Sequence, residues 1–223
     1  IAFSPDGQLL LAASQDHTAR LITIQTGKEL AKFEFGDQVT VISFSADGRY
    51  FVAGSDDKTA RMFESAPNSE RNLFNLGGFI TASSLSFDGQ YLAASVENGT
   101  TRIIAVETGK EICNVVFDHG VSELRFSPNG RLFVAGVGAG VCVVEVDTGK
   151  TVFMLESVGR LSATSFSPDS SQVCVGGSDG SVQIINLVSR KALNLAKFSN
   201  RITKVDFSPN QQSIVASSHD GTF

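Results

Sequence analysis

Residues that could act as acids, bases, nucleophiles or metal ligands are sparse in this sequence. The three histidines lie far apart in the chain, at His17, His119 and His219. The three cysteines form no C-x-x-C pair, and an odd number of cysteines gives neither a disulfide framework nor a zinc ligand set. Each lies in an apolar run, which indicates a small buried side chain: Cys113, Cys142 and Cys174. We therefore predict no metal and no cofactor, and the cysteine usage favours a reducing compartment, the cytoplasm.

Charge and hydropathy argue against two classes of partner. The formal net charge is -5, and the 18 basic residues are scattered along the chain. Nucleic-acid-binding surfaces show clustered Lys and Arg, so we expect no nucleic-acid partner. A membrane-spanning helix needs roughly 18 or more consecutive apolar residues, and no stretch approaches that length. We therefore expect no membrane insertion.

One five-residue pattern organises the chain, Phe-Ser-Pro-Asp-Gly at residues 3–7. Variants of it begin at residues 44, 85, 126, 166 and 207, so the steps are 41, 41, 41, 40 and 41 residues. A period this strict indicates a repeat architecture. Within the pattern, Asp and Gly favour a tight turn, because Asp bonds to nearby backbone and Gly accepts a positive φ.

Each copy predicts four strands. Residues 39–44 alternate and are β-branched, residues 50–54 are almost entirely apolar, and residues 59–63 follow a second turn. In the first copy, residues 29–35 alternate charged with apolar side chains, as a half-exposed edge strand does. A sheet that is apolar on both faces must stack on its neighbours, and radial stacking gives a β-propeller. A β-helix is the alternative, although its repeats are shorter.

Three motifs together resemble the WD-repeat β-propeller family. They are the Ser-Pro-Asp-Gly turn, the segment Ser-Asp-Asp-Lys-Thr-Ala-Arg-Met-Phe at residues 55–63, and Thr-Gly-Lys at residues 26–28, 108–110 and 148–150. The sequence departs from the family in lacking Trp, with Phe63-Glu64 and Ile185-Asn186 among the pairs in place of Trp-Asp, and in lacking the Gly-His pair. Of the family's hydrogen-bonded tetrad, only Ser and Asp remain, as at Ser55 and Asp57. We expect these blades to rely on apolar packing instead.

The resemblance implies an all-β fold, a β-propeller of four-stranded antiparallel blades. The domain spans residues 1–223, with repeats that begin near residues 1, 39, 80, 121, 161 and 202. We expect five full blades and most of a sixth. The chain begins and ends inside predicted strands, so we expect an incomplete propeller from a longer protein, with seven blades in the whole ring or, alternatively, six.

Two kinds of loop should meet at one rim of such a propeller and vary while the framework repeats. The loops before the first strands supply these candidate binding residues: Asp37, Gln38, Phe79, His119, Arg160 and Arg201. The turns between second and third strands supply a further set: Gln15, His17, Asp56, Lys58, Glu97 and His219. Phe79 stands out as an aromatic residue in a Gly-Gly-Phe loop, which could be either an exposed anchor or a side chain folded back into the channel.

Several other motifs have structural explanations. Arg20, Arg61 and Arg102 recur at one place in the third strand, where we expect each to pack its stem and pair with a nearby acid rather than form a ligand-binding ring. The glycine-rich residues 137–140 have no following helix or nearby Lys to cradle a phosphate, so we predict a turn there. Asn98-Gly99-Thr100 matches a glycosylation acceptor, but Asn-Gly also favours a turn, which is our prediction.

These features support a non-catalytic protein-interaction domain, a scaffold or a sensor in a larger protein or assembly. Its partner would be a protein or peptide, or other domains of the same polypeptide. One alternative is an enzyme or cofactor-binding propeller that uses His and Asp residues along the channel, and it requires two or more of the histidines to approach each other. A second alternative is a purely architectural domain that contacts only its own polypeptide.

Overall fold

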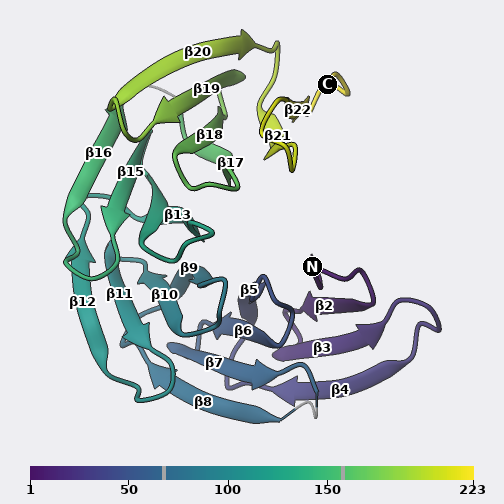
Figure 1. Ribbon diagram of the computed structural model, residues 1–223. Coiled ribbons are helices and arrows are strands. Elements are labelled where there is room, and N and C mark those ends of the chain that lie inside the picture. The colour runs from purple at the N-terminus through teal and green to yellow at the C-terminus, as the bar shows by residue number, and fades with distance from the viewer. Residues whose placement is uncertain (67–68, 157–158) are drawn as a thin grey trace. The chain divides into compact units, whose positions relative to one another are not determined.

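The computed structural model describes residues 1–66, 69–156 and 159–223, which form strands and turns and contain no helix. The chain divides into two compact units, residues 1–120 and residues 121–223. Each is described by itself. Within each sheet the neighbouring strands are antiparallel, and their spatial order is their order in the sequence (Figure 1).

Unit 1 has three four-stranded sheets in its described residues. The first consists of β1 (Ala2–Phe3), β2 (Leu9–Ala13), β3 (Thr18–Thr23) and β4 (Glu29–Glu34). The second consists of β5 (Val39–Phe44), β6 (Tyr50–Ser55), β7 (Thr59–Glu64) and β8 (Glu70–Asn75). The third consists of β9 (Ile80–Leu85), β10 (Tyr91–Val96), β11 (Thr100–Ala105) and β12 (Glu111–Val116).

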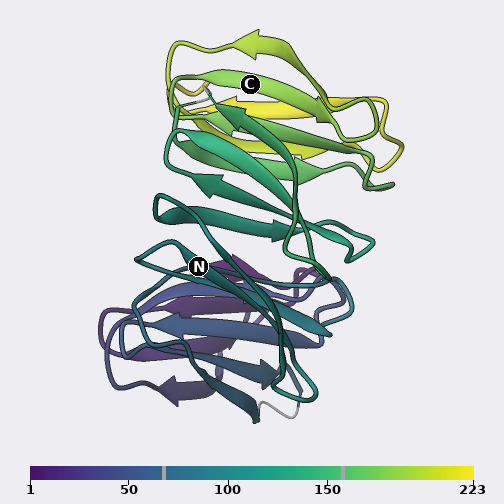
Figure 2. The ribbon, with the colours of Figure 1, turned by 90° about the vertical axis from the view of Figure 1, so that its left-hand side faces the viewer.

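Unit 2 has two four-stranded sheets and one two-stranded sheet in its described residues (Figure 2). The fourth sheet of the chain consists of β13 (Val121–Phe126), β14 (Leu132–Val137), β15 (Gly140–Glu145) and β16 (Thr151–Glu156). The fifth consists of β17 (Leu161–Phe166), β18 (Gln172–Gly177), β19 (Ser181–Asn186) and β20 (Lys191–Lys197). The sixth sheet consists of β21 (Ile202–Phe207) and β22 (Ile214–Ser218).

Burial along the strands confirms the predicted four-stranded unit. In the second sheet, β6 is buried almost throughout and β7 is mostly buried. The fourth strand β4 alternates between exposed and partly buried side chains. The fourth strand β20 is exposed along its whole length, because the neighbouring sixth sheet contributes only β21 and β22 among the described residues. An outer strand therefore gains its buried face from the next sheet.

Apolar packing replaces the missing indole, as the sequence predicts. Phe63, in the place of the expected Trp, is 1% exposed. Its ring stacks on Phe51 with centroids 5.0 Å apart and lies 4.2 Å from the ring of Phe33, which belongs to the preceding sheet. Such aromatic pairs contribute beyond their buried area. The cluster around them joins the first and second sheets, and a second cluster around Met62 joins the second and third.

A β-bulge recurs near the start of the first strand and was not predicted from the sequence. In β5 the register shifts between Val39 and Val41, and the same irregularity occurs in β13, β17 and β21. The residue at the bulge carries a hydroxyl. The Ser162 hydroxyl donates to the Gly176 carbonyl at 3.1 Å and to the Ile202 carbonyl of the next sheet at 2.7 Å. The bulge thus links adjacent sheets through a side chain.

Glycine at the end of the second strand permits this close approach. A Cβ at Gly54 would lie 2.7 Å from a methyl carbon of Ile80, and one at Gly176 would lie 2.4 Å from the corresponding carbon of Ile202. Any larger residue would push the neighbouring sheet away.

Two of the predicted turns are confirmed. Gly138 and Ala139 form a two-residue hairpin between Val137 and Gly140. Gly99 has a φ of 83°, and Asn98 accepts a hydrogen bond from the Thr100 N–H, as in a turn. The connection from β7 to β8 ends before residue 70, which already pairs with residue 63; residues 67–68 lie outside the described residues.

Candidate functional site

The two kinds of predicted loop lie side by side in the second, third, fifth and sixth sheets. In each, a backbone N–H of the turn that follows the second strand donates to a carbonyl of the loop before the first strand. These bonds join Asp56 to Gln38 at 3.0 Å, Glu97 to Phe79 at 3.1 Å, Ser178 to Arg160 at 2.9 Å, and His219 to Arg201 at 2.9 Å. We use the name loop surface for the twelve residues that the sequence predicts on loops and turns of this kind, and those of each unit are described by themselves. Their role in binding stays a prediction.

Side-chain contacts hold part of the loop surface at the second sheet. The Gln38 side-chain amide donates to a carboxylate oxygen of Asp56 at 2.5 Å. The imidazole Nε2 of His17 lies 3.8 Å from a carboxylate oxygen of Asp37. Both side chains of that pair are more than half exposed, so the interaction is weak in water. The sequence placed these four residues on loops but could not pair them.

Phe79 is the most exposed aromatic residue of the loop surface, at 48%. The Lys58 ammonium lies 6.0 Å from the centroid of its ring, at the edge of the range for a cation–π contact. Glu97 lies beneath the same loop, since a Cβ on Gly78 would lie 2.6 Å from its carboxylate. Phe79 is therefore not buried in the apolar core of the described residues. Its ring lies at the surface near the Lys58 ammonium.

The remaining residues of the loop surface are also exposed. Gln15 lies in the turn after β2, and His119 lies in the loop after β12. In unit 2, the Arg160 N–H donates to the Ser178 hydroxyl at 3.0 Å, which fixes the loop backbone while its side chain stays exposed. Arg201 and His219 share the backbone bond given above, and both side chains are exposed.

Asp57 anchors the loops without belonging to the exposed set. It accepts hydrogen bonds from the Gly36 N–H at 2.9 Å and from the N–H and hydroxyl of Thr59. Burial raises the pKa of this carboxyl, but these hydrogen bonds outweigh that effect and hold the pKa below its usual value. The Ser55 hydroxyl accepts from the Asp57 N–H and donates to the Asp37 carbonyl. The two retained members of the family tetrad thus bind main chain.

The recurring arginines pair with acids, as predicted. Arg20 lies 2.6 Å from Asp16, Arg61 lies 3.4 Å from Asp57, and Arg102 lies 3.6 Å from Glu111. The Arg61 guanidinium also lies 4.5 Å from the centroid of the Phe35 ring, on the preceding sheet. These contacts explain why Arg recurs at this position of the third strand: it packs its side chain and pairs with a nearby acid.

The described residues offer neither a metal-binding cluster nor a helix that could span a membrane. No group of three or more His, Cys, Asp or Glu residues there is placed to hold a metal ion. No helix of bilayer-spanning length and apolarity occurs in residues 1–66, 69–156 and 159–223. Burial raises the pKa of Cys142 to about 11 and that of Cys174 to about 12, so both thiols stay protonated and unreactive at neutral pH.

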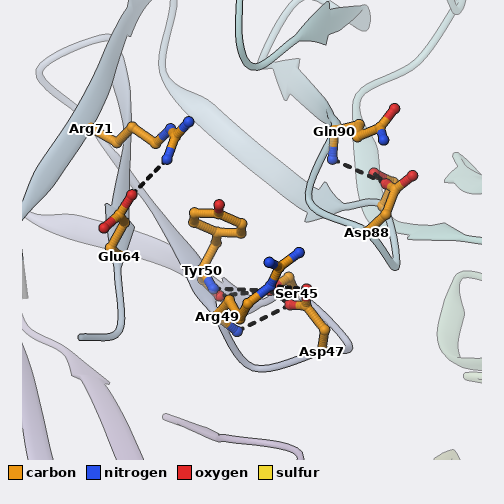
Figure 3. A network of polar contacts seen from close by, with 9 residues as sticks. Ser45, Asp47, Arg49, Tyr50, Glu64, Arg71, Asp88 and Gln90 are labelled. Atoms are coloured by element: carbon orange, nitrogen blue, oxygen red, sulfur yellow. Dashed lines mark hydrogen bonds and ion pairs between the residues drawn. The ribbon is translucent and has the colours of Figure 1, made fainter. Parts of the chain in front are cut away.

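Sequence reasoning missed a polar groove at the other end of the strands in unit 1. It surrounds Tyr50, the first residue of β6, at the end away from the loop surface. Arg49 and Arg71 place their guanidinium carbons 5.6 and 5.4 Å from the centroid of the Tyr50 ring (Figure 3). Asp88 lies across from them in the same view. The sequence did contain a signal for this groove, because Arg71 occupies a position that is aliphatic in the other repeats.

Glu123 is a second residue that sequence reasoning missed. It lies on β13, the first strand of the fourth sheet, where the aligned positions of the second, third and fifth sheets are Val41, Ala82 and Ala163. Burial raises the pKa of its carboxyl above the usual value, although Arg125 and the Thr164 N–H act in the opposite direction. It is a partly buried acid at a position that is apolar in these three sheets and is Lys204 in the sixth.

Comparison with known families agrees with this architecture. The family model described as WD domain, G-beta repeat, matches residues 1–23, 27–64, 150–186 and 194–223, together more than half of the chain. The described residues between the matched ranges form sheets of the same order. No curated protein matches the chain.

Proposed function

Because the chain belongs to the WD-repeat family, we propose that it is a non-catalytic protein-interaction domain that binds a protein or peptide through the loop surface. Repeats of this family are commonly interaction scaffolds, and a β-propeller blade offers exposed loops on a rigid support. In this proposal the domain serves as a scaffold or sensor, and its partner is another protein or another domain of the same polypeptide.

The observation that carries the proposal is the pairing of Lys58 with Phe79. Lys58 has a φ of 72°, a backbone conformation that a side chain makes costly, whereas the aligned residues of the third and fifth sheets are Gly99 and Gly180. Strain of this kind is retained where the surrounding structure or function requires the side chain. Its ammonium lies near the ring of the exposed Phe79. Aromatic and basic side chains that stand exposed on rigid loops are typical of binding hot spots.

A location in the cytoplasm is part of the same proposal. The buried thiols of Cys142 and Cys174 form no disulfide, and free buried cysteines fit a reducing compartment.

The test is capture of partners by the immobilised chain, measured by quantitative mass spectrometry for the wild type, Phe79→Ala and Val188→Ala. Val188 is the control, since it is an apolar residue that is 83% exposed in the turn after β19 and belongs neither to the loop surface nor to the groove around Tyr50. We expect capture of specific partners to fall at least about tenfold for Phe79→Ala, as it does for truncated hot spots, and to stay unchanged for Val188→Ala. Equal capture by all three proteins would contradict the proposal.

The variant Lys58→Gly should change partner binding and protein stability in opposite directions. Relief of the strained backbone should raise the free energy of unfolding by about 0.5–1 kcal/mol, while loss of the ammonium weakens capture. A variant that is more stable and binds equally well would remove Lys58 from the proposed site.

A further inference from the structure

Three adjoining cavities form a continuous groove in unit 1, which begins at the end of the strands away from the loop surface and extends along β8. Their volumes are about 640, 410 and 340 Å³. The first and second share Arg49 and Tyr50 as lining residues, and the second and third share Glu107 and Thr108. Buried Met62 and Val106 form an apolar floor in the middle cavity. A chain of cavities suits an extended segment better than a compact small molecule.

Residues in and beside this groove break the repeat without a structural need. Arg71 follows the first residue of β8, and the same place in the other fourth strands is aliphatic: Leu30, Ile112, Val152 and Ala192. Phe87 occupies a turn position that is Pro or Ala in the other copies, and it is 52% exposed beside the lining residue Asp88. An exposed aromatic side chain contributes nothing to the core, so its presence points to contact with a partner.

The guanidinium groups of the groove are neutralised by their own acids. Arg49 lies 2.7 Å from Asp47, Arg71 lies 2.5 Å from Glu64, and Arg102 lies 3.6 Å from Glu111. Figure 3 shows the first two pairs on either side of the Tyr50 ring. Each of these pairs carries no net charge.

Three lining carboxylates have no cation within ion-pairing distance among the described residues: Asp6, Asp88 and Glu107. Asp88 is fixed in place, because one of its oxygens accepts hydrogen bonds from the Ser86 hydroxyl at 2.7 Å and the Gln90 N–H at 3.0 Å. Asp6 is held in the same way by Ser4 and Gln8. Each of these two aspartates therefore presents its second oxygen in a set direction. The groove carries an unpaired negative charge at positions spread along its length.

We propose that this groove binds an extended peptide segment that carries basic side chains. The lysines or arginines of the segment pair with Asp6, Asp88 and Glu107, its apolar side chains contact the Met62 floor, and Phe87 packs against its exterior. Electrostatic complementarity of this kind gives specificity and speeds association. The groove is separate from the loop surface, so the protein binds two partners or two parts of one.

The test is selection of displayed random octapeptides on the wild-type chain, followed by measurement of how well the enriched pool binds to variants. We expect the pool to be enriched in peptides with two or more Lys or Arg residues. Its binding should fall at least about tenfold on the double variant Asp88→Asn, Glu107→Gln, since removal of one partner of a charge pair at an interface is costly. Phe87→Ala should weaken it severalfold without any change of charge.

Two controls make the outcome decisive. Asp147→Asn with Glu156→Gln removes the same charge from exposed residues in unit 2, and it should leave binding unchanged. Phe79→Ala alters the loop surface and should also leave this pool bound. An acidic or neutral pool, no enrichment, or an equal loss on both charge variants would overturn the groove proposal. Loss on Phe79→Ala alone would overturn it while supporting the loop surface.

Discussion

At the residue scale, departures from the repeat distinguish residues that packing explains from residues that packing does not explain. Phe63 replaces an expected Trp and is buried against two other rings, so its role is explained by packing. Lys58 replaces Gly at a positive φ and is exposed, so packing does not explain it. Glu123 stands where the second, third and fifth sheets have Val or Ala, and it is partly buried, where a charge is costly.

The raised pKa of Glu123 predicts a pH dependence of stability. Folding favours its protonated form, so its contribution is fully present below the pKa of the unfolded chain and is lost as pH rises through the folded pKa. We expect Glu123→Gln to be more stable than the wild type at pH 7 and to match it near pH 3. Urea unfolding at several pH values measures this difference.

Glu156→Gln is the control, since Glu156 is exposed on β16. It should shift stability little at any pH. If Glu123→Gln destabilises the protein at pH 7, the carboxylate makes a favourable interaction that outweighs its burial.

At the element scale, the bulge in the first strand and its hydroxyl decide how closely neighbouring sheets approach. The hydroxyl residue is Thr40, Thr81, Ser122, Ser162 or Thr203, and each donates to a carbonyl of the second strand. Thr40 and Ser162 reach the next sheet as well. A glycine stands opposite the bulge in the second, fourth and fifth sheets, where it leaves room for the neighbouring sheet: Gly54, Gly136 and Gly176.

Ser162→Ala tests the hydroxyl link. The variant loses both hydrogen bonds and leaves two carbonyls without this donor, so the free energy of unfolding should fall by about 1–2 kcal/mol. Ser162→Thr keeps a hydroxyl, and Thr occurs naturally at three of the five positions. Its free energy of unfolding should therefore stay close to that of the wild type. Denaturant unfolding measures both, and equal stability of all three proteins would show that the link contributes nothing.

At the scale of the whole molecule, apolar clusters join neighbouring sheets within each compact unit. In unit 1, one cluster includes Phe51 and Phe63 and another includes Met62 and Leu92, so each of the three sheets has a packed neighbour. In unit 2, similar clusters join the fourth, fifth and sixth sheets. Stacked repeats need about three copies to bury enough apolar surface for stability.

Residues 1–120 contain three sheets and should therefore fold on their own. We expect a strand-type circular dichroism spectrum and a cooperative thermal transition from this fragment. Residues 1–79 contain two sheets and should show neither, because the apolar face of the second sheet is left uncovered. An unfolded 1–120 fragment would mean that unit 1 depends on the rest of the chain.

Much of the fold could be predicted from the sequence. The period of 41 residues and the Asp-Gly turns locate the strands, because a hairpin is a local structure set by turn chemistry and alternation. The apolar strands require sheets to stack, since burial on both faces needs a neighbour on each. The loop carrying Phe79 and the turn carrying Glu97 were also predicted to share one end of a sheet, since antiparallel order dictates it.

Tertiary structure decided what depends on contacts between repeats. The exposure of Phe79, the approach of Lys58 to its ring, and the partly buried state of Glu123 depend on which neighbour lies against each side chain. The groove around Tyr50 is lined by side chains from successive sheets. Its carboxylates without a cation can be identified only when the ion pairs of the arginines are known. A repeat sequence encodes each blade by local rules, whereas a binding surface is set by how side chains from successive blades pack and pair.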